Sequence, residues 1–126
     1  MFKELDKILE NKHGKILFAG IGNVLKSDDG AGVYVSNRII SNDNILALTV
    51  ETGIENYIGK INSLNPDILV LIDCADMNLP PGSFSLLDTN HIQDLTFNTH
   101  NISLSRLTDF FNMPVYTLAI QPENIH

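Results

Sequence analysis

Two carboxylates and one imidazole stand beside apolar segments of this chain, at positions where a side chain can face a cleft. Asp29 lies in a glycine-rich loop, Asp73 follows the apolar run 68–72, and His100 precedes a predicted late helix. Carboxylate oxygens and an imidazole nitrogen form an O2N set that suits a borderline divalent metal with open coordination positions. The sequence therefore predicts a site in which these three side chains bind a metal or carry out acid–base chemistry.

The glycine-rich loop at residues 20–32 reads GIGNVLKSDDGAG. It follows a predicted strand and opens a predicted helix, which is where a doubly wound sheet places its ligands. A dinucleotide site is the rival interpretation, but Leu25 stands where G-x-G-x-x-G needs its third glycine, and two adjacent acids would repel a pyrophosphate. Because one acid is enough to cap the helix, we assign Asp28 as the cap and Asp29 as the ligand.

Each remaining candidate has a competing interpretation. Asp73 could accept backbone hydrogen bonds from a neighbouring loop, and Asp76 could serve that loop in its place. Cys74 suggests a thiol nucleophile with His100 as its base, but neighbouring acids disfavour a thiolate, so a buried structural cysteine is preferred. The other histidines lie near the chain ends or in a polar stretch: His13, His126 and His91.

The apolar pattern alternates between short β-branched runs and helical spacing, which predicts a three-layer α/β/α fold with a mixed, mainly parallel, five-stranded sheet. In such a sheet Asp73 lies at the same carboxyl edge as the glycine-rich loop. The expected strands are at residues 16–21, 45–50, 68–72, 83–87 and 115–120, the fourth of them antiparallel at an edge. The expected helices are at residues 2–10, 30–40, 54–64 and 103–111.

Length and composition bound the class of protein. A chain of 126 residues predicts one domain over residues 1–126, and a net charge of -7 without a basic run argues against nucleic acid and anionic membrane as partners. The single cysteine and the charged N-terminus favour a reducing cytoplasm. The apolar runs are too short to cross a membrane, so we expect a soluble monomer.

The last expected strand ends six residues before the end of the chain, at His126. In this architecture a final strand is normally followed by a covering helix. We therefore expect that the native polypeptide continues and that this chain lacks its C-terminal helix, which would leave apolar surface exposed.

Four blocks of sequence, taken in order, resemble a known family. They are the glycine-rich loop, LVLIDCADM with the PPG that follows it, THNISL and AIQPE. Together they are similar to the hydrogenase maturation endopeptidases, in the branch that processes formate-hydrogenlyase-type nickel-iron hydrogenases. The resemblance runs from Lys15 to Glu123 and is weakest across residues 42–50 and 88–97.

The resemblance implies an endopeptidase that removes a C-terminal extension from the large-subunit precursor of a nickel-iron hydrogenase after nickel insertion. It implies that Asp29, Asp73 and His100 contact nickel, which arrives with the substrate. Some members carry Glu at the position of Asp29, and the loop at residues 51–54 begins here with Glu51 where Asp is usual. A non-cleaving chaperone or binding module that senses nickel on the same precursor is the alternative function.

The hydrolytic step has two possible forms. A metal-polarised carbonyl or water could carry out the hydrolysis, or a carboxylate such as Asp29 or Asp73 could act as general base. The sequence leaves both open.

Overall fold

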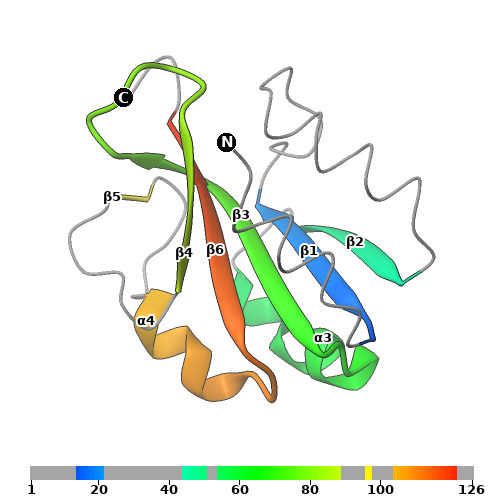
Figure 1. Ribbon diagram of the computed structural model, residues 1–126. Coiled ribbons are helices and arrows are strands. Elements are labelled where there is room, and N and C mark those ends of the chain that lie inside the picture. The colour runs from blue at the N-terminus through cyan, green and yellow to red at the C-terminus, as the bar shows by residue number, and fades with distance from the viewer. Residues whose placement is uncertain (1–13, 22–43, 51–53, 89–95, 98–103, 122–126) are drawn as a thin grey trace.

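In the part of the chain that the structure describes, five strands form the main path of a sheet in the order β2, β1, β3, β6 and β4, and a short sixth strand pairs with β3 (Figure 1). The structure is a computed structural model, and it describes residues 14–21, 44–50, 54–88, 96–97 and 104–121. The strands are β1 (Ile16–Ile21), β2 (Ile45–Val50), β3 (Ile68–Asp76), β4 (Phe84–Asp88) and β6 (Val115–Ile120). β1 pairs in parallel with β2 and β3, β3 pairs in parallel with β6, and β4 runs antiparallel to β6. The predicted mixed, mainly parallel sheet with an antiparallel edge strand is therefore confirmed.

The third strand is longer than predicted. The apolar run ends at Ile72, but β3 continues to Asp76 because its backbone finds partners beyond that point. Asp73 and Cys74 pair with β6, and the next two residues pair antiparallel with the short strand β5 (Thr96–Phe97), which was not predicted. Backbone hydrogen bonding to distant segments, rather than side-chain hydrophobicity, sets the end of this strand.

The helical segments in the described part of the chain agree with the prediction. η2 (Ile54–Tyr57) and α3 (Ile58–Leu64) fill the expected helix at 54–64, and α4 (Leu104–Leu107) with η4 (Thr108–Phe110) fill most of 103–111. Asn65 ends α3 in a left-handed conformation, with its N–H directed to the carbonyls of Ile61 and Asn62, and a proline follows. The helices expected at residues 2–10 and 30–40 lie outside the described residues.

The sheet has an apolar core on each face, as a sheet covered on both sides requires. Ile61, Leu107 and Phe111 from the helical segments pack on one face, here called the α3 face, together with alternate strand residues. Those strand residues are Leu17, Ala19, Ile21, Val50, Leu69, Leu71 and Val115. The intervening residues form the second cluster on the opposite face, and it includes Phe18, Val70, Ile72, Leu118 and Ile120.

Hydrogen bonds join the starts of β1 and β3 at the amino edge of the sheet. The carboxylate Oδ2 of Asp67 accepts from the N–H of Lys15 at 2.8 Å, and the N–H of Asp67 donates to the carbonyl of Lys15 at 2.8 Å. Gly14 has φ +104°, and a Cβ built there would overlap the Asp67 carboxylate. Glycine is therefore required at this position by both conformation and space.

No helix in the described part of the chain is long and apolar enough to cross a membrane.

Gly14→Ala should destabilise the fold by at least about 2 kcal/mol, because it forces a positive φ on an L-residue and displaces the Asp67 carboxylate from the N–H of Lys15. Gly59→Ala is the matched control. Gly59 lies in α3 with open space around its Cβ position, so alanine should stabilise the fold by about 0.5 to 1 kcal/mol. Urea unfolding measures both changes, and equal effects of the two substitutions would contradict the packing described at Gly14.

Candidate functional site

Parallel pairing brings the carboxyl ends of the central strands to one level. Ile21 at the end of β1 pairs with Val50, and Asp73 pairs with Ala119 of β6. Because Gly20 pairs with Ile72, Asp73 lies beside Ile21, the last residue of β1, from which the chain continues through the glycine-rich segment. The carboxyl edge of the sheet thus holds Asp73 next to the point from which that loop departs.

Asp73 is a buried carboxylate. Its side chain is 1% exposed, and the alternation of residues along β3 places it on the α3 face, one step beyond Leu69 and Leu71. It has a polar partner within the structure. Burial of a carboxylate among apolar side chains is costly unless it is hydrogen-bonded, paired or bound to a metal, so such groups are uncommon as core filler.

The structure places only part of the predicted site. Asp29 and His100 lie outside the described residues, as does Asp28, so the triad with Asp73 stays a prediction. Among the described residues, no group of three His, Cys, Asp or Glu side chains could hold a metal ion. Cys74 and Asp76 lie on β3 after Asp73, and their backbones pair with β6 and β5 respectively.

A second buried polar residue at this edge was not singled out by the sequence. Gln121 directly follows β6 and is 2% exposed. Its side-chain oxygen Oε1 accepts from the N–H of Met77 at 2.6 Å and, at a longer 3.5 Å, from the N–H of Leu79. The sequence signal that could have identified Gln121 is the one that identified Asp73, a polar residue directly after an apolar run.

The backbone of Gln121 holds the far end of the same loop. Its N–H donates to the carbonyl of Ser83 at 2.7 Å, and its carbonyl accepts from the N–H of Gly82 at 3.0 Å. Residues 77–83, here called the β3–β4 loop, are thus attached to one residue at both ends. The loop stands at the carboxyl ends of β3 and β6 (Figure 1).

The β3–β4 loop contains a rigid turn at residues 80–83. The N–H of Ser83 donates to the carbonyl of Pro80 at 3.1 Å, and Gly82 has φ +86°, as in a type II turn with proline before glycine. Asn78 also has a positive φ, of 57°. Two prolines and two left-handed positions leave the loop little conformational freedom.

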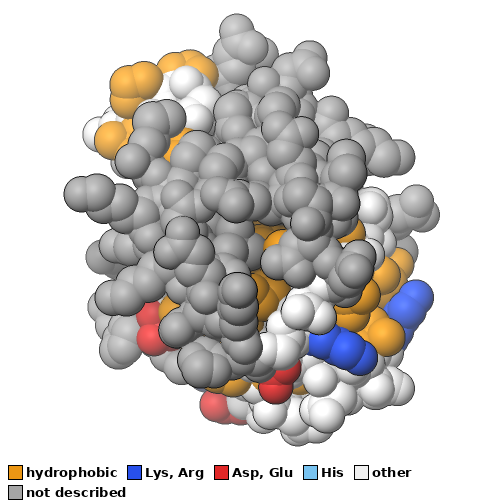
Figure 2. Space-filling view, turned by 45° about the vertical axis from the view of Figure 1, so that its right-hand side comes forward, with side chains coloured by type: hydrophobic (Ala, Val, Ile, Leu, Met, Phe, Trp, Pro, Cys, Tyr) orange, Lys and Arg blue, Asp and Glu red, His pale blue; other side chains and the backbone are white. Residues whose placement is uncertain are grey.

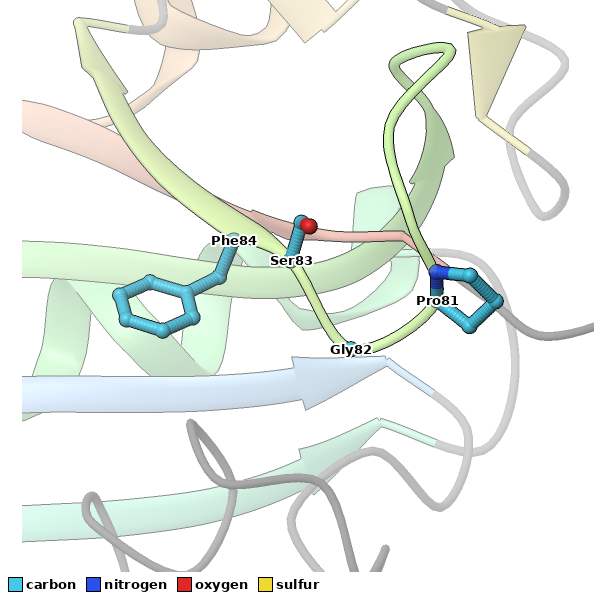
Figure 3. A pocket seen from close by; sticks show the side chains of 4 residues that line it. All are labelled: Pro81, Gly82, Ser83 and Phe84. Atoms are coloured by element: carbon cyan, nitrogen blue, oxygen red, sulfur yellow. The ribbon is translucent and has the colours of Figure 1, made fainter.

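A hollow of about 400 Å³ opens at this turn and is lined by Pro81, Gly82, Ser83 and Phe84. Figure 3 shows the rings of Pro81 and Phe84 directed away from each other on either side of Gly82, with the Ser83 side chain between them. The carboxyl edge of the sheet thus carries a buried carboxylate on β3 and, at the start of β4, a stiff loop that borders an open hollow. A carboxylate in this setting can bind a metal or accept a proton, and the hollow has room for a side chain.

A family profile and individual relatives match this chain to the same class of protein. The sequence profile of the HycI family, described as hydrogenase maturation protease, matches residues 36–123. The hydrogenase 3 maturation protease of Escherichia coli is 31% identical over 109 residues, which cover 82% of this chain and 70% of that protein. A Methanocaldococcus jannaschii protein, grouped by its name with the hydrogenase maturation proteases, is 30% identical over 135 residues, or 96% of this chain and 79% of that protein.

The fold is shared with a solved structure. The crystal structure of the nickel-iron hydrogenase maturation protease HycI from Thermococcus kodakarensis superposes with a TM-score of 0.69 at 24% identity. The match covers 95% of this chain and 81% of that one.

Proposed function

This chain belongs to the hydrogenase maturation protease family and is a peptidase, and from that premise we propose that it removes the C-terminal extension of a nickel-iron hydrogenase large-subunit precursor after nickel insertion. The observation that carries the proposal is the position of Asp73. This buried carboxylate lies at the carboxyl edge of a parallel sheet, beside the strand end that leads into the glycine-rich loop. That edge is where open α/β sheets bind their ligands.

Asp29, Asp73 and His100 together form the nickel-contacting set in this proposal. Two carboxylates and one imidazole fill only part of the coordination shell of nickel. The nickel therefore keeps its ligands from the substrate while it contacts these three side chains. The nickel thus arrives with the precursor, and its presence indicates that nickel insertion is complete. Its position would also orient the scissile peptide toward the same side chains.

Two routes of hydrolysis are compatible with this site. In one, nickel polarises the scissile carbonyl or the attacking water. In the other, the carboxylate of Asp29 or Asp73 takes a proton from water, the water oxygen bonds to the carbonyl carbon, and the C–N bond breaks as the leaving amine receives the proton. Both routes need an ionised carboxylate at the carboxyl edge. We place the reaction in the cytoplasm, in keeping with the single cysteine.

Asp73→Asn and His100→Ala should each slow cleavage of nickel-loaded precursor by at least about a hundredfold, because each removes a metal contact or a proton acceptor. His91→Ala is the control, since His91 is assigned no role at the site. The rate at which the shortened large subunit appears on a gel measures the effect. A His100→Ala protein that cleaves at the rate of the His91→Ala control would refute the assignment.

The adjacent acids of the glycine-rich loop should differ in their response to the same change. Asp29→Asn should abolish cleavage, because an amide is a poor metal ligand and cannot act as a general base. Asp28→Asn should keep both activity and stability, because asparagine caps helices about as well as aspartate. Cleavage rates and thermal unfolding of the two variants test this, and the reverse order of activities would exchange the two assignments.

Cys74→Ser should retain most of the cleavage activity, within about threefold of the unchanged protein, because a serine hydroxyl cannot replace a catalytic thiolate but can replace a structural thiol. Cleavage rate with and without a thiol-alkylating reagent is the measurement. Loss of activity in both experiments would favour the cysteine-dependent alternative.

A further inference from the structure

The β3–β4 loop depends on one residue for its shape. Three of its backbone N–H groups, those of Met77, Leu79 and Gly82, donate to Gln121, and Pro80 and Pro81 have no N–H to offer. A short loop at a sheet edge usually satisfies its backbone with its own turns or with water. Here the hydrogen bonds of Met77, Leu79 and Gly82 converge on one buried residue, through its side chain and its backbone.

Gln121 is also a close neighbour of Asp73. Thr117, Ala119 and Gln121 follow Val115 at intervals of two, which places them on the α3 face with Asp73. Since Asp73 pairs with Ala119, Gln121 lies diagonally across from Asp73, with a Cα separation of about 8 Å from standard strand spacings. The residue that shapes the loop therefore stands next to the proposed cleavage site.

The outer surface of the β3–β4 loop is apolar and open. Leu79 is 47% exposed, although large aliphatic side chains are usually covered, and the two prolines beside it are exposed as well. Figure 2 shows hydrophobic side chains standing out at the end of the molecule that this loop occupies in Figure 1, whereas the charged side chains visible in that view lie in the lower half. Beyond Leu79 the surface continues into the hollow lined by Pro81 and Phe84.

The adjoining strand offers an extended peptide a place to bind. β4 is an edge strand of the described sheet, and among the described residues no strand pairs with its outer edge. An extended peptide can add to such an edge through its backbone while one of its side chains enters a hollow at the strand end. The start of β4 and the hollow both lie at the carboxyl edge, because Phe84 pairs with Ile120.

We propose that Gln121 is a positioning residue that holds the β3–β4 loop in the shape that receives an extended segment of the precursor at the carboxyl edge of the sheet, the edge that also carries Asp73. This inference rests on the proposed function for the identity of the peptide. The loop contacts the segment through Leu79 and the hollow, and the segment runs along the start of β4. Gln121 touches no substrate and acts only through the N–H groups of Met77, Leu79 and Gly82.

Gln121→Met tests the proposal, because methionine has a similar length but lacks the acceptor oxygen. The dissociation constant and KM of nickel-loaded precursor should each rise about tenfold, the factor that about 1.4 kcal/mol corresponds to, while kcat stays within about twofold. Gln121→Glu keeps the acceptor and should restore KM to within about threefold of the unchanged protein.

Asn62→Met is the matched control. The amide of Asn62 also makes two hydrogen bonds to backbone groups. Its Nδ2 donates to the carbonyl of Phe110 at 2.9 Å, and its Oδ1 accepts from the N–H of Asn112 at 3.0 Å. These bonds lie at the amino end of β6, away from the β3–β4 loop. Asn62→Met should therefore lower the melting temperature without changing KM or the dissociation constant.

Leu79→Ser keeps the test decisive if Gln121→Met does not fold, because Leu79 is about half exposed and its replacement leaves the core intact. It should weaken binding about fivefold or more. If wild-type protein binds the precursor without shortening it, the proposed function fails, and the positioning role of Gln121 stands only if Gln121→Met and Leu79→Ser raise the dissociation constant. If wild-type protein cleaves but Gln121→Met and Leu79→Ser bind like wild type, the inference made here is overturned.

Discussion

The parallel pairing of β3 with both β1 and β6 is the constraint on which the rest of this structure depends. It fixes where the chain leaves the sheet after each strand, and so it determines which polar residues can meet at the carboxyl edge. The register is strongly specified because both faces of β3 are buried. A slip of one residue would exchange the two faces and move Asp73 away from the α3 face.

Buried polar residues at this edge differ in what they are bound to. Gln121 is occupied by backbone groups of the β3–β4 loop, which makes it part of the scaffold. Asp73 lies deeper, at the level of Ile21, where the glycine-rich loop begins. The same face of the sheet therefore carries the carboxylate on which the proposed function rests and an amide that holds the neighbouring loop in one conformation.

Much of this fold could be predicted because its strands are short, continuous apolar runs. The strands at 16–21, 45–50 and 115–120 and the helical segment at 54–64 have the predicted bounds, since buried parallel strands and an amphipathic helix leave unmistakable local patterns. The extension of β3 and the existence of β5 could not be predicted in this way, because they depend on pairing between residues from 20 positions (Asp76 with Thr96) to 46 positions (Asp73 with Ala119) apart.

The site was predictable to a smaller extent. Asp73 could be singled out because an acid directly after an apolar run is seldom core filler, and the structure places it buried at the carboxyl edge, while its role at the site stays a prediction. The role of Gln121 was hidden, because its partners lie 42 and 44 positions earlier and no local pattern records a hydrogen bond of that range. Asp29 and His100 remain predictions from residue type and family resemblance.

The proposed function requires that this peptidase shortens the large subunit only after nickel has been inserted. Intact-protein mass spectrometry of the large subunit tests it most directly, with nickel-free and nickel-loaded precursor incubated separately with the protein. Only the nickel-loaded form should lose mass, by one fixed C-terminal segment. An unchanged mass for both forms, or equal shortening of both, would contradict it.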